Sequence, residues 1–395
     1  MEDKAKNAKN TENSKNSNGS RNKKSAISPD SAPELRSLPS RRSPERRLSS
    51  GGRRWPAEWE THRATWLSWP HEQSDWPGKF GPIPWVWAEI VRLISLEEQV
   101  ELFVPERAER KVAAVLRKAG ADLSAVNLHP QPTNRVWMRD AGGIFIQDEK
   151  GRKGLLDWRF NAWAKYDDWG LDDRLPGAMA AICQLPASRV WQPTQQRKRI
   201  VLEGGAIEGN GAGTMLTTRE CLLSSVQERN PGFSARDYET IFEQWLGVDK
   251  VIWLERGIVG DDTHGHVDDL ARFVSPRTVV AVRDVDQQSP NYELLEENIR
   301  ILKQEKNAQG EKLEVIDLPM PASIAFAGRI LPASYANYLL TNGSVLVPTF
   351  NDEKDRSALG ILADCFPGRK AIGVHALDLV WGLGTLHCLS QQEPE

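Results

Sequence analysis

Two histidines and an aspartate stand at alternate positions in the segment GDDTHGHVDDLARF. If this segment is an extended strand, His264, His266 and Asp268 point to the same face. Three interpretations fit such a face: metal ligands, an acid/base pair, or ordinary polar residues at the end of a strand. The chain has only seven histidines and no HExxH motif, so a metal site built on this segment is short of ligands.

A second reactive side chain, Cys388, lies in the segment WGLGTLHCLSQQEP. Two nearby glycines, Gly382 and Gly384, permit a close approach of the backbone. A lone cysteine is most often a small buried hydrophobe. Here a separate histidine and aspartate elsewhere in the chain supply the other ingredients of covalent cysteine catalysis. Cys388 is therefore a candidate nucleophile.

The other three cysteines, Cys183, Cys221 and Cys365, stand in apolar surroundings and are predicted to belong to the core. Four cysteines are too few for a disulfide framework in a chain of 395 residues, and none forms a CxxC pair. This usage favours a reducing compartment, and we expect a cytoplasmic protein.

A third segment, TNRVWMRDAGG, places the carboxylate of Asp140 three residues after Trp137. Adjacent residues such as Arg139 and Asp140 are typical of an exposed ion pair, which contributes little to the stability of the fold. An apolar wall beside a carboxylate is also what a flat cationic group requires. By itself this segment does not decide between the two interpretations.

The elements that must position these residues are short strands and helices in alternation. Brief β-branched or aromatic runs are predicted as strands at 62–69, 99–105, 142–148, 154–160, 199–205, 213–218, 250–255, 278–284, 313–318, 344–350 and 371–376. Apolar residues with helical spacing predict helices at 85–98, 106–120, 237–247, 291–310 and 352–366. This alternation indicates an α/β fold. No tandem repeat of fixed period is visible.

The first 54 residues differ from the rest in composition. They hold 14 Lys/Arg and 6 Asp/Glu, a net charge of +8, and since the whole chain carries −3, the remaining residues carry −11. Residues 1–54 are predicted to be a disordered basic tail, and a single catalytic domain is predicted over 55–395. For the tail, a solvated segment is favoured over one that binds nucleic acid. In the whole sequence, no apolar run approaches the ~20 residues of a membrane span.

Taken together, these segments resemble the agmatine deiminases and their relatives, the bacterial peptidylarginine deiminases, within the enzymes that modify guanidino groups. The resemblance rests on stretches that follow one another in order: WPAEWETHRATWLSWPHEQSDWPGKF, VWMRDAGGIF, LLDWRFNAW, VLEGGAIEGNGAGTMLTTRECLL, GDDTHGHVDD, NGSVLVPTFND and GLGTLHCLSQQEP. They span about residues 55–394. Several long motifs in one order are far more specific than any of them alone.

The resemblance implies the pentein fold, a five-bladed pseudo-symmetric α/β-propeller of ββαβ modules around a central channel. It implies neither a metal nor an organic cofactor. Residue by residue, Cys388 matches the family's nucleophile and His266 its general acid/base. Asp140 and Asp268 match the two carboxylates that hold the guanidinium, and Trp137 matches an aromatic residue of the substrate pocket.

The implied activity is hydrolytic deimination of a small cationic guanidino substrate, without nucleic acid or membrane as a partner. The expected reaction converts agmatine to N-carbamoylputrescine and ammonia, within putrescine biosynthesis, through a covalent amidino-thioether on Cys388. His264 falls where the family pattern varies, and either a supporting or a purely structural role fits it. A homo-oligomer is compatible with the resemblance.

Four departures from the family pattern leave the far end of the substrate open. They are Ala141-Gly142-Gly143 in place of x-Gly-Pro, Asn210 in place of a common Asp, NAWAKY in place of NxWGGKY, and Leu383 within a glycine run. A peptidyl-arginine or another guanidino compound is therefore an alternative to agmatine. A metal-dependent hydrolase that uses His264, His266 and Asp268, and a binding protein without turnover, are the alternatives of other classes.

Overall fold

The structure, a computed structural model, describes residues 52–395 of the chain. The predicted basic tail, residues 1–54, therefore lies outside the described residues except for its last three. Of these, Arg54 is buried, pairs with Glu60 and forms an antiparallel bridge with Gln147. The last predicted tail residue thus packs onto the folded body.

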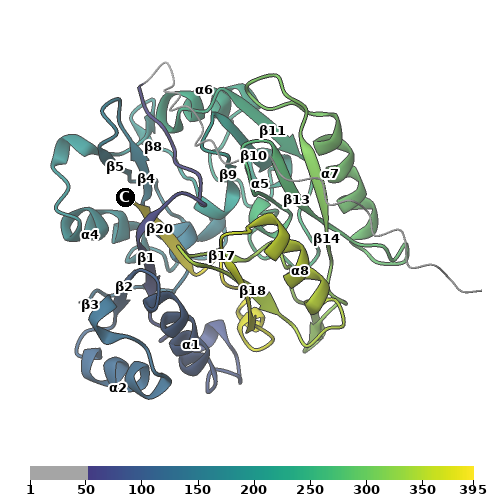
Figure 1. The fold of residues 1–395 in the computed structure, drawn as a ribbon. Coiled ribbons are helices and arrows are strands. Elements are labelled where there is room, and N and C mark those ends of the chain that lie inside the picture. Colours follow the sequence, from purple (N-terminus) through teal and green to yellow (C-terminus); the bar gives the residue numbers. More distant parts are fainter. Residues whose placement is uncertain (1–51) are drawn as a thin grey trace, which may run out of the picture. The chain divides into compact units, whose positions relative to one another are not determined.

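Five sheets of one local topology make up this body (Figure 1). In each sheet the first strand runs antiparallel to the second, and the second runs parallel to the third. The sheets are β20 (Ser390–Pro394), β1 (His62–Ser68), β2 (Gln99–Val104) and β3 (Val126–Pro130); β4 (Ile144–Gln147), β5 (Lys153–Leu156) and β6 (Val190–Trp191); β9 (Glu208–Gly209), β10 (Thr214–Thr218) and β11 (Lys250–Leu254); β12 (Ala271–Phe273), β13 (Thr278–Arg283) and β14 (Glu314–Pro319); and β17 (Leu339–Leu340), β18 (Ser344–Thr349) and β19 (Lys370–His375). Two short ribbons, β7 (Thr194–Gln195) with β8 (Lys198–Arg199) and β15 (Ala325–Phe326) with β16 (Arg329–Ile330), lie outside these sheets.

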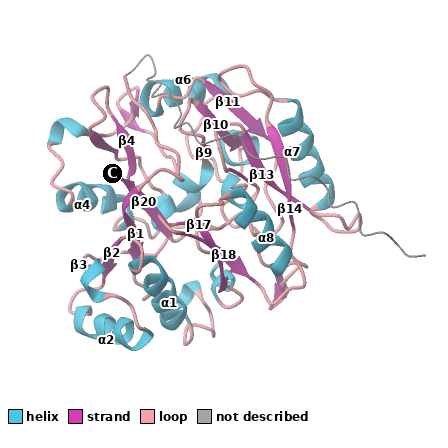
Figure 2. Ribbon diagram, in the orientation of Figure 1, coloured by secondary structure: helices cyan, strands magenta, loops and turns pink. Residues whose placement is uncertain are grey.

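A helix connects the parallel strands of every sheet, because parallel neighbours need a long crossover. These helices are α1 (Ile83–Ser95) and α2 (Glu109–Ala119) in the first sheet, then α4 (Leu175–Ile182), α6 (Ala235–Leu246), α7 (Tyr292–Gln304) and α8 (Asp355–Cys365). In α7, Leu295, Ile299 and Leu302 are buried at helical spacing. Figure 2 shows α2, α4, α6 and α7 toward the outside of this body, with β9, β17 and β20 nearer its middle.

The predicted α/β alternation is confirmed: all five predicted helices overlap an observed helix, and ten of the eleven predicted strands overlap an observed strand by more than one residue. The strand predicted at 199–205 is wrong, because after Arg199 only Val201 forms a bridge and Gly204–Ala206 is a 3₁₀ turn. The sequence analysis also missed α4 and, among the strands of the five sheets, β3, β6, β9, β12, β17 and β20. The helix predicted at 291–310 ends early, since Asn307 and Gly310 form a turn there.

Large aromatic side chains fill the interior between sheets and helices. Trp66, Trp76 and Trp87 are fully buried, and the indole N–H of Trp66 donates to Glu393 Oε2 at 2.9 Å. Trp76 packs edge-on against Trp87 with ring centroids 5.9 Å apart. Such rings bury a large apolar area and pack in specific geometries, so they stabilise the arrangement of the sheets and helices. Among residues 52–395, no helix is long and apolar enough to cross a bilayer.

Candidate active site

Five segments of the chain meet at one place, and each lies directly before the first strand of one sheet. They are α3 (Met138–Ala141) before β4, Gly204–Ala206 before β9, Val267–Asp269 before β12, residues 334–338 before β17 and residues 385–389 before β20. Hydrogen bonds join neighbouring segments: the Arg139 N–H donates to the Cys388 carbonyl at 3.1 Å, the Gly205 N–H to Asp140 Oδ1 at 3.1 Å, and the Asn337 amide to Asp269 Oδ1 at 3.0 Å. The repeated topology therefore brings five distant stretches of sequence together.

Cys388 lies at this meeting point, 7% exposed, with its sulfur held by Asn337. The side-chain amide of Asn337 donates to Cys388 Sγ at 3.0 Å and to Asp269 Oδ1 at 3.0 Å. Its carbonyl oxygen accepts the backbone N–H groups of His387 and Cys388. Burial, followed by Asp268, Asp269 and Asp140, raises the pKa of the Cys388 thiol well above its ordinary value. The free protein therefore holds a thiol at this position.

Asp140 is positioned by α3 and by two hydrogen bonds to its carboxylate. The indole N–H of Trp163 donates to Oδ2 at 2.9 Å, and the backbone N–H of Gly205 donates to Oδ1 at 3.1 Å. Burial raises the pKa of Asp140 to about 6, against the opposing effect of His266. A cation bound here would favour the ionised carboxylate.

His266 lies between two carboxylates at distances longer than a hydrogen bond. Its Nδ1 is 3.7 Å from Asp140 Oδ1, and its Nε2 is 3.8 Å from Glu203 Oε2. Burial works to lower its pKa, but Asp140, then Cys221 and Glu203, outweigh burial and raise the pKa well above the ordinary value. This balance favours the imidazolium form of the ring, and in the described part of the chain Nε2 has no hydrogen-bond partner.

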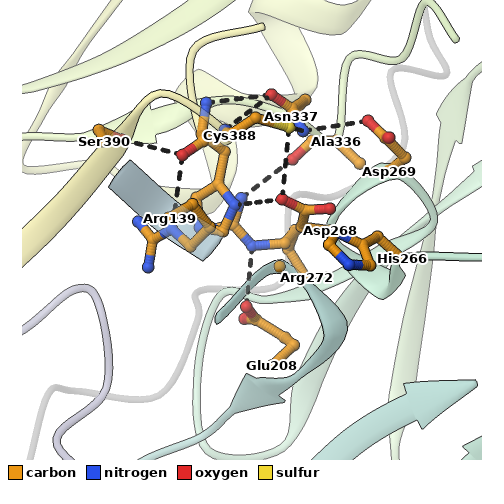
Figure 3. A network of polar contacts seen from close by, with 12 residues as sticks. Arg139, Glu208, His266, Asp268, Asp269, Arg272, Ala336, Asn337, Cys388 and Ser390 are labelled. Atoms are coloured by element: carbon orange, nitrogen blue, oxygen red, sulfur yellow. Dashed lines mark hydrogen bonds and ion pairs between the residues drawn. The ribbon is translucent and has the colours of Figure 1, made fainter. Parts of the chain in front are cut away.

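Asp268 lies between Cys388 and His266 (Figure 3), and a second buried histidine, His387, holds it. His387 Nδ1 lies 2.7 Å from Asp268 Oδ2, and its Nε2 lies 2.7 Å from Glu58 Oε1. Asp268 Oδ2 is also 3.7 Å from Cys388 Sγ. The other oxygen, Oδ1, is buried and has no hydrogen-bond partner among residues 52–395. A buried carboxylate oxygen without a donor is a natural position for a cationic N–H donor.

Gly205 marks where three of the predicted residues converge. A Cβ atom at this position would lie 2.5 Å from His266 Nδ1, 2.8 Å from Asp140 Oδ1 and 3.1 Å from Asp268 Oδ2. Any side chain here would therefore enter the space between the imidazole and the two carboxylates. The structure thus brings Asp140, His266, Asp268 and Cys388 together, although up to 248 residues separate them in sequence.

A pocket of about 330 Å³ opens onto this meeting point. Asp140, Cys388 and Trp137 line its inner part, and the Trp137 ring would lie 2.7 Å from a Cβ on Gly384. Trp137 is 7% exposed and packs against Trp76 with centroids 5.9 Å apart. The volume of the pocket is at the small end of the usual range for ligand pockets, which suits a small substrate.

The third residue of the predicted histidine cluster, His264, is not part of this arrangement. The extended conformation that would place the three residues on one face is absent: His264 has φ +67° and Gly265 has φ +98°, and the backbone turns instead of extending. His264 Nε2 lies 3.0 Å from Ser224 Oγ. Because alternate residues share a face only in an extended segment, His264 does not join His266 and Asp268 in one ligand set.

Two other groups of side chains in the described structure have metal-ligand chemistry. Each brings three possible ligand atoms within 4.8 Å: Glu203, Cys221 and His266 in one, and Glu58, Glu208 and His387 in the other. Arg229 Nε pairs with Glu203 at 3.1 Å, and Arg272 pairs with both Glu58 and Glu208. These guanidinium groups already balance the carboxylates, which disfavours a further cation at either group.

Several residues of the site were missed by the sequence analysis. Glu203, Asn337, Glu58 and His387 each contact a predicted site residue or its neighbour. His387 directly precedes Cys388, and Glu203 directly precedes a Gly-Gly pair, so adjacency was the available signal.

Cys221 was predicted to be an ordinary core residue, and that description is incomplete. It is fully buried, but its sulfur lies within 4.8 Å of ligand atoms of Glu203 and His266. Its backbone N–H is bound by the Thr218 hydroxyl at the start of α5 (Arg219–Leu223). Substitution of Cys221 would therefore disturb His266, which makes Cys365 a cleaner control cysteine.

Two departures from the family pattern coincide with left-handed backbone near the pocket. Ala164, in NAWAKY, has φ +52°, and Leu383, within the glycine run, has φ +70°. Such values are costly for residues other than glycine. Asn210, by contrast, lies in a turn, where its carbonyl oxygen accepts N–H groups of Ala212 and Thr214 at 2.9 Å.

The chain matches the family model described as Porphyromonas-type peptidyl-arginine deiminase over residues 54–394. A curated protein of Latilactobacillus sakei, which carries the provisional name agmatine deiminase, is 35% identical over 366 residues, covering 87% of this chain and 96% of that protein.

Solved structures show the same similarity. Agmatine deiminase of Enterococcus faecalis is 30% identical with a TM-score of 0.80, covering 89% of this chain and 99% of that one. A cysteine-to-serine variant of a C. jejuni agmatine deiminase, solved with substrate bound, is also 30% identical, with a TM-score of 0.77, covering 87% and 96%.

Proposed function

Because the chain belongs to the family of Porphyromonas-type peptidyl-arginine deiminases, we propose that it hydrolyses a guanidino group to a ureido group and ammonia, with agmatine as the substrate and N-carbamoylputrescine as the product. The convergence of Asp140, His266, Asp268 and Cys388 around Gly205 carries this proposal. The names of the E. faecalis and C. jejuni relatives support agmatine.

The guanidinium binds between the carboxylates of Asp140 and Asp268. Asp268 Oδ1, which lacks a donor in the described structure, accepts an N–H of the substrate, and the two charges offset the desolvation of the cation. They also orient the guanidinium carbon toward Cys388 Sγ, which lies 3.7 Å from Asp268 Oδ2. Trp137 lies along the pocket as an aromatic wall.

The bound cation also activates the nucleophile. In the free protein, carboxylates at the site raise the pKa of Cys388. A guanidinium between them offsets this charge, so the thiol loses its proton to solvent and becomes a thiolate. Thiolate, imidazolium and guanidinium are then present together, the combination that the first step needs.

In the first half-reaction, the thiolate attacks the guanidinium carbon and forms an S–C bond. His266 donates a proton to the departing nitrogen, the C–N bond breaks and ammonia leaves, which gives a cationic amidino-thioether on Cys388. Neutral His266 then removes a proton from water as the oxygen attacks the same carbon. The S–C bond breaks, the thiolate returns, and the remaining hydroxyl proton passes to solvent as the ureido product forms.

We also propose that the five sheets are the five blades of a pseudo-symmetric propeller of ββαβ modules around a central channel, and that residues 55–395 act as one catalytic domain. The repeated strand directions of the sheets support this arrangement. So does the place of each site segment, directly before the first strand of its sheet.

The test is release of ammonia from agmatine, measured beside free arginine and a peptide that contains arginine. Agmatine should give the highest kcat/KM, and mass spectrometry of a quenched reaction should find the agmatine-derived adduct on Cys388. Cys388→Ser should abolish turnover, because a hydroxyl is a weak nucleophile at neutral pH, whereas Cys365→Ser should keep it. If the peptide gives the highest kcat/KM, a peptidyl-arginine rather than agmatine is the substrate. Turnover that a chelator abolishes and that leaves no adduct on Cys388 would contradict the mechanism.

A further inference from the structure

The pocket extends outward from Cys388 to a second set of polar side chains that the proposed chemistry does not use. Its lining also includes Ser74, Asp75, Arg135, Tyr166, Asp262 and Arg329, which we call its outer part because the Arg329 side chain is 55% exposed, whereas Cys388 is 7% exposed. One small cavity thus joins the reacting end to a charged outer end. A substrate held at its guanidinium places its other end among these groups.

Among the carboxylates of the outer part, Asp75 has an unsatisfied oxygen; the neighbouring Arg135 also has a buried Nε without an acceptor among residues 52–395. The Asp75 side chain is only 2% exposed, and one carboxylate oxygen pairs with Arg135. The other oxygen, Oδ2, is buried and has no hydrogen-bond partner among residues 52–395. A buried carboxylate oxygen that lacks a donor requires an explanation, and a ligand that donates a hydrogen bond is one.

The charges around Asp75 favour a further cation. Arg135 is the guanidinium beside it, and Arg135 also pairs with Asp168 at 3.2 Å. Burial raises the pKa of Asp75 to about 7 against the effect of Arg135, and Glu72 and Asp168 raise it further. Several carboxylates therefore act against one guanidinium, and an added ammonium would stabilise the ionised form of Asp75.

The second acid of the outer pocket, Asp262, does not have this property. Lys165 donates to it at 2.6 Å, the hydroxyl of Tyr166 donates at 2.6 Å, and Arg329 lies at 3.2 Å. These partners lower the pKa of Asp262 despite its burial. Asp262 is already satisfied by cations and donors of the protein, which leaves Asp75 as the acceptor for a cation of the substrate.

We infer that Asp75 Oδ2 binds the ammonium group at the end of the substrate opposite the guanidinium. This inference rests on the proposed function and deepens it, because it assigns the residue that holds the ammonium end of agmatine. A peptide-bound arginine lacks such an ammonium at this distance along its side chain. Trp163, Tyr166 and Trp381, which also line the pocket, would contact the methylene chain between the two cations.

The experiment compares agmatine with n-butylguanidine, which has the same carbon chain and no ammonium. The wild-type protein should prefer agmatine by about 10–100-fold in kcat/KM, as expected for a desolvated charge pair. Asp75→Asn should lose most of that preference through a higher KM for agmatine, and its kcat/KM for n-butylguanidine should stay within about threefold of wild type.

Asp168→Asn is the matched control, because Asp168 also pairs with Arg135 but its side chain is 52% exposed. It should keep the preference for agmatine. If Asp75→Asn lowers kcat/KM equally for agmatine and n-butylguanidine, then Asp75 only holds Arg135 in place, and the inference is overturned.

Two further outcomes keep the test independent of folding and of the proposed function. If Asp75→Asn does not fold, equal kcat/KM of the wild-type protein for agmatine, N-acetylagmatine and n-butylguanidine would overturn the inference, and a clear preference for agmatine would support it. If the wild-type protein releases ammonia from no guanidine, the proposed function itself fails. Turnover of agmatine with no preference for it contradicts only the assignment of Asp75.

Discussion

Two buried histidines of the site differ in how tightly they are held. His387 has carboxylate oxygens of Asp268 and Glu58 at 2.7 Å from its two ring nitrogens. His266 has carboxylate oxygens at 3.7 and 3.8 Å, beyond hydrogen-bond length. Both side chains are 1% exposed. A ring that is hydrogen-bonded on both sides is a scaffold, whereas a loosely held ring can approach a substrate and transfer a proton.

The charges around the two rings differ in the same sense. Carboxylates outweigh burial at His266 and raise its pKa well above the ordinary value. At His387, burial, Arg139 and Arg272 together lower the pKa. One ring is therefore set to carry a proton to a leaving group, and the other is set to orient Asp268. The comparison shows that residue type alone does not separate an acid/base from a positioning group.

The largest effect is expected from His266→Asn. Without the imidazolium, no group at the site protonates the departing nitrogen, so kcat should fall by about 10²–10⁴-fold. Stopped assays of ammonia release from agmatine measure this loss. His264→Asn is the control, because His264 contacts Ser224 and should leave kcat within a few-fold of wild type. Comparable losses in the two variants would mean that the roles assigned to the neighbouring histidines are wrong.

A smaller loss is expected from His387→Gln. Glutamine can donate to Asp268 or to Glu58 but replaces the imidazole bridge poorly, so the Asp268 carboxylate is less well oriented. We expect kcat/KM for agmatine to fall by about 10–100-fold, with a raised KM. The shape of the pH profile should be unchanged, since His387 transfers no proton. If the alkaline limb of the pH profile moves in His387→Gln, then His387 acts as an acid/base group, and the two histidines do not differ in role.

Glu203→Gln should shift the pH dependence without abolishing turnover. The imidazolium form of His266 is required for ammonia to leave, so activity is lost as pH rises through its raised pKa. Glu203, whose own pKa is lowered to about 2 by Arg229 and His266 despite burial, is one cause of that raised value. Removing its charge should move the alkaline limb of kcat about one to two pH units lower. Glu203→Asp, which keeps the negative charge, should move this limb less. An alkaline limb that is unchanged in Glu203→Gln would contradict this prediction.

The smallest effect concerns the turn that aims Trp163 at Asp140, the carboxylate closest to His266. Ala164 is exposed and has φ +52°. Ala164→Gly removes this strain, and part of the gain is offset by the greater freedom of glycine in the unfolded chain. The free energy of unfolding should rise by about 0.5–1 kcal/mol in urea denaturation, with activity unchanged. A decrease would show that the turn is unstrained.

Local patterns in the sequence were sufficient for the α/β class and for most of the longer helices and strands, but not for the short first strands β9, β12 and β17 that follow site segments. Leu295, Ile299 and Leu302 show helical spacing because the helix buries one face, a local consequence of geometry. Cys388, Asp140, Asp268 and His266 were identified through motifs that resemble a family. The structure then placed the last three around Gly205 and Cys388 beside Asp268.

Only the tertiary structure decided which polar residues accompany them. Glu58 and His387 are 329 positions apart, and no local pattern links them. His264 does not share a face with His266 and Asp268 because two positive φ values turn the chain, and the contact of His264 with Ser224 holds that turn. The free oxygens of Asp268 and Asp75 likewise depend on which donors the fold brings near. Residue type and spacing set the available chemistry, whereas distances between segments far apart in sequence set charge, proton position and substrate choice.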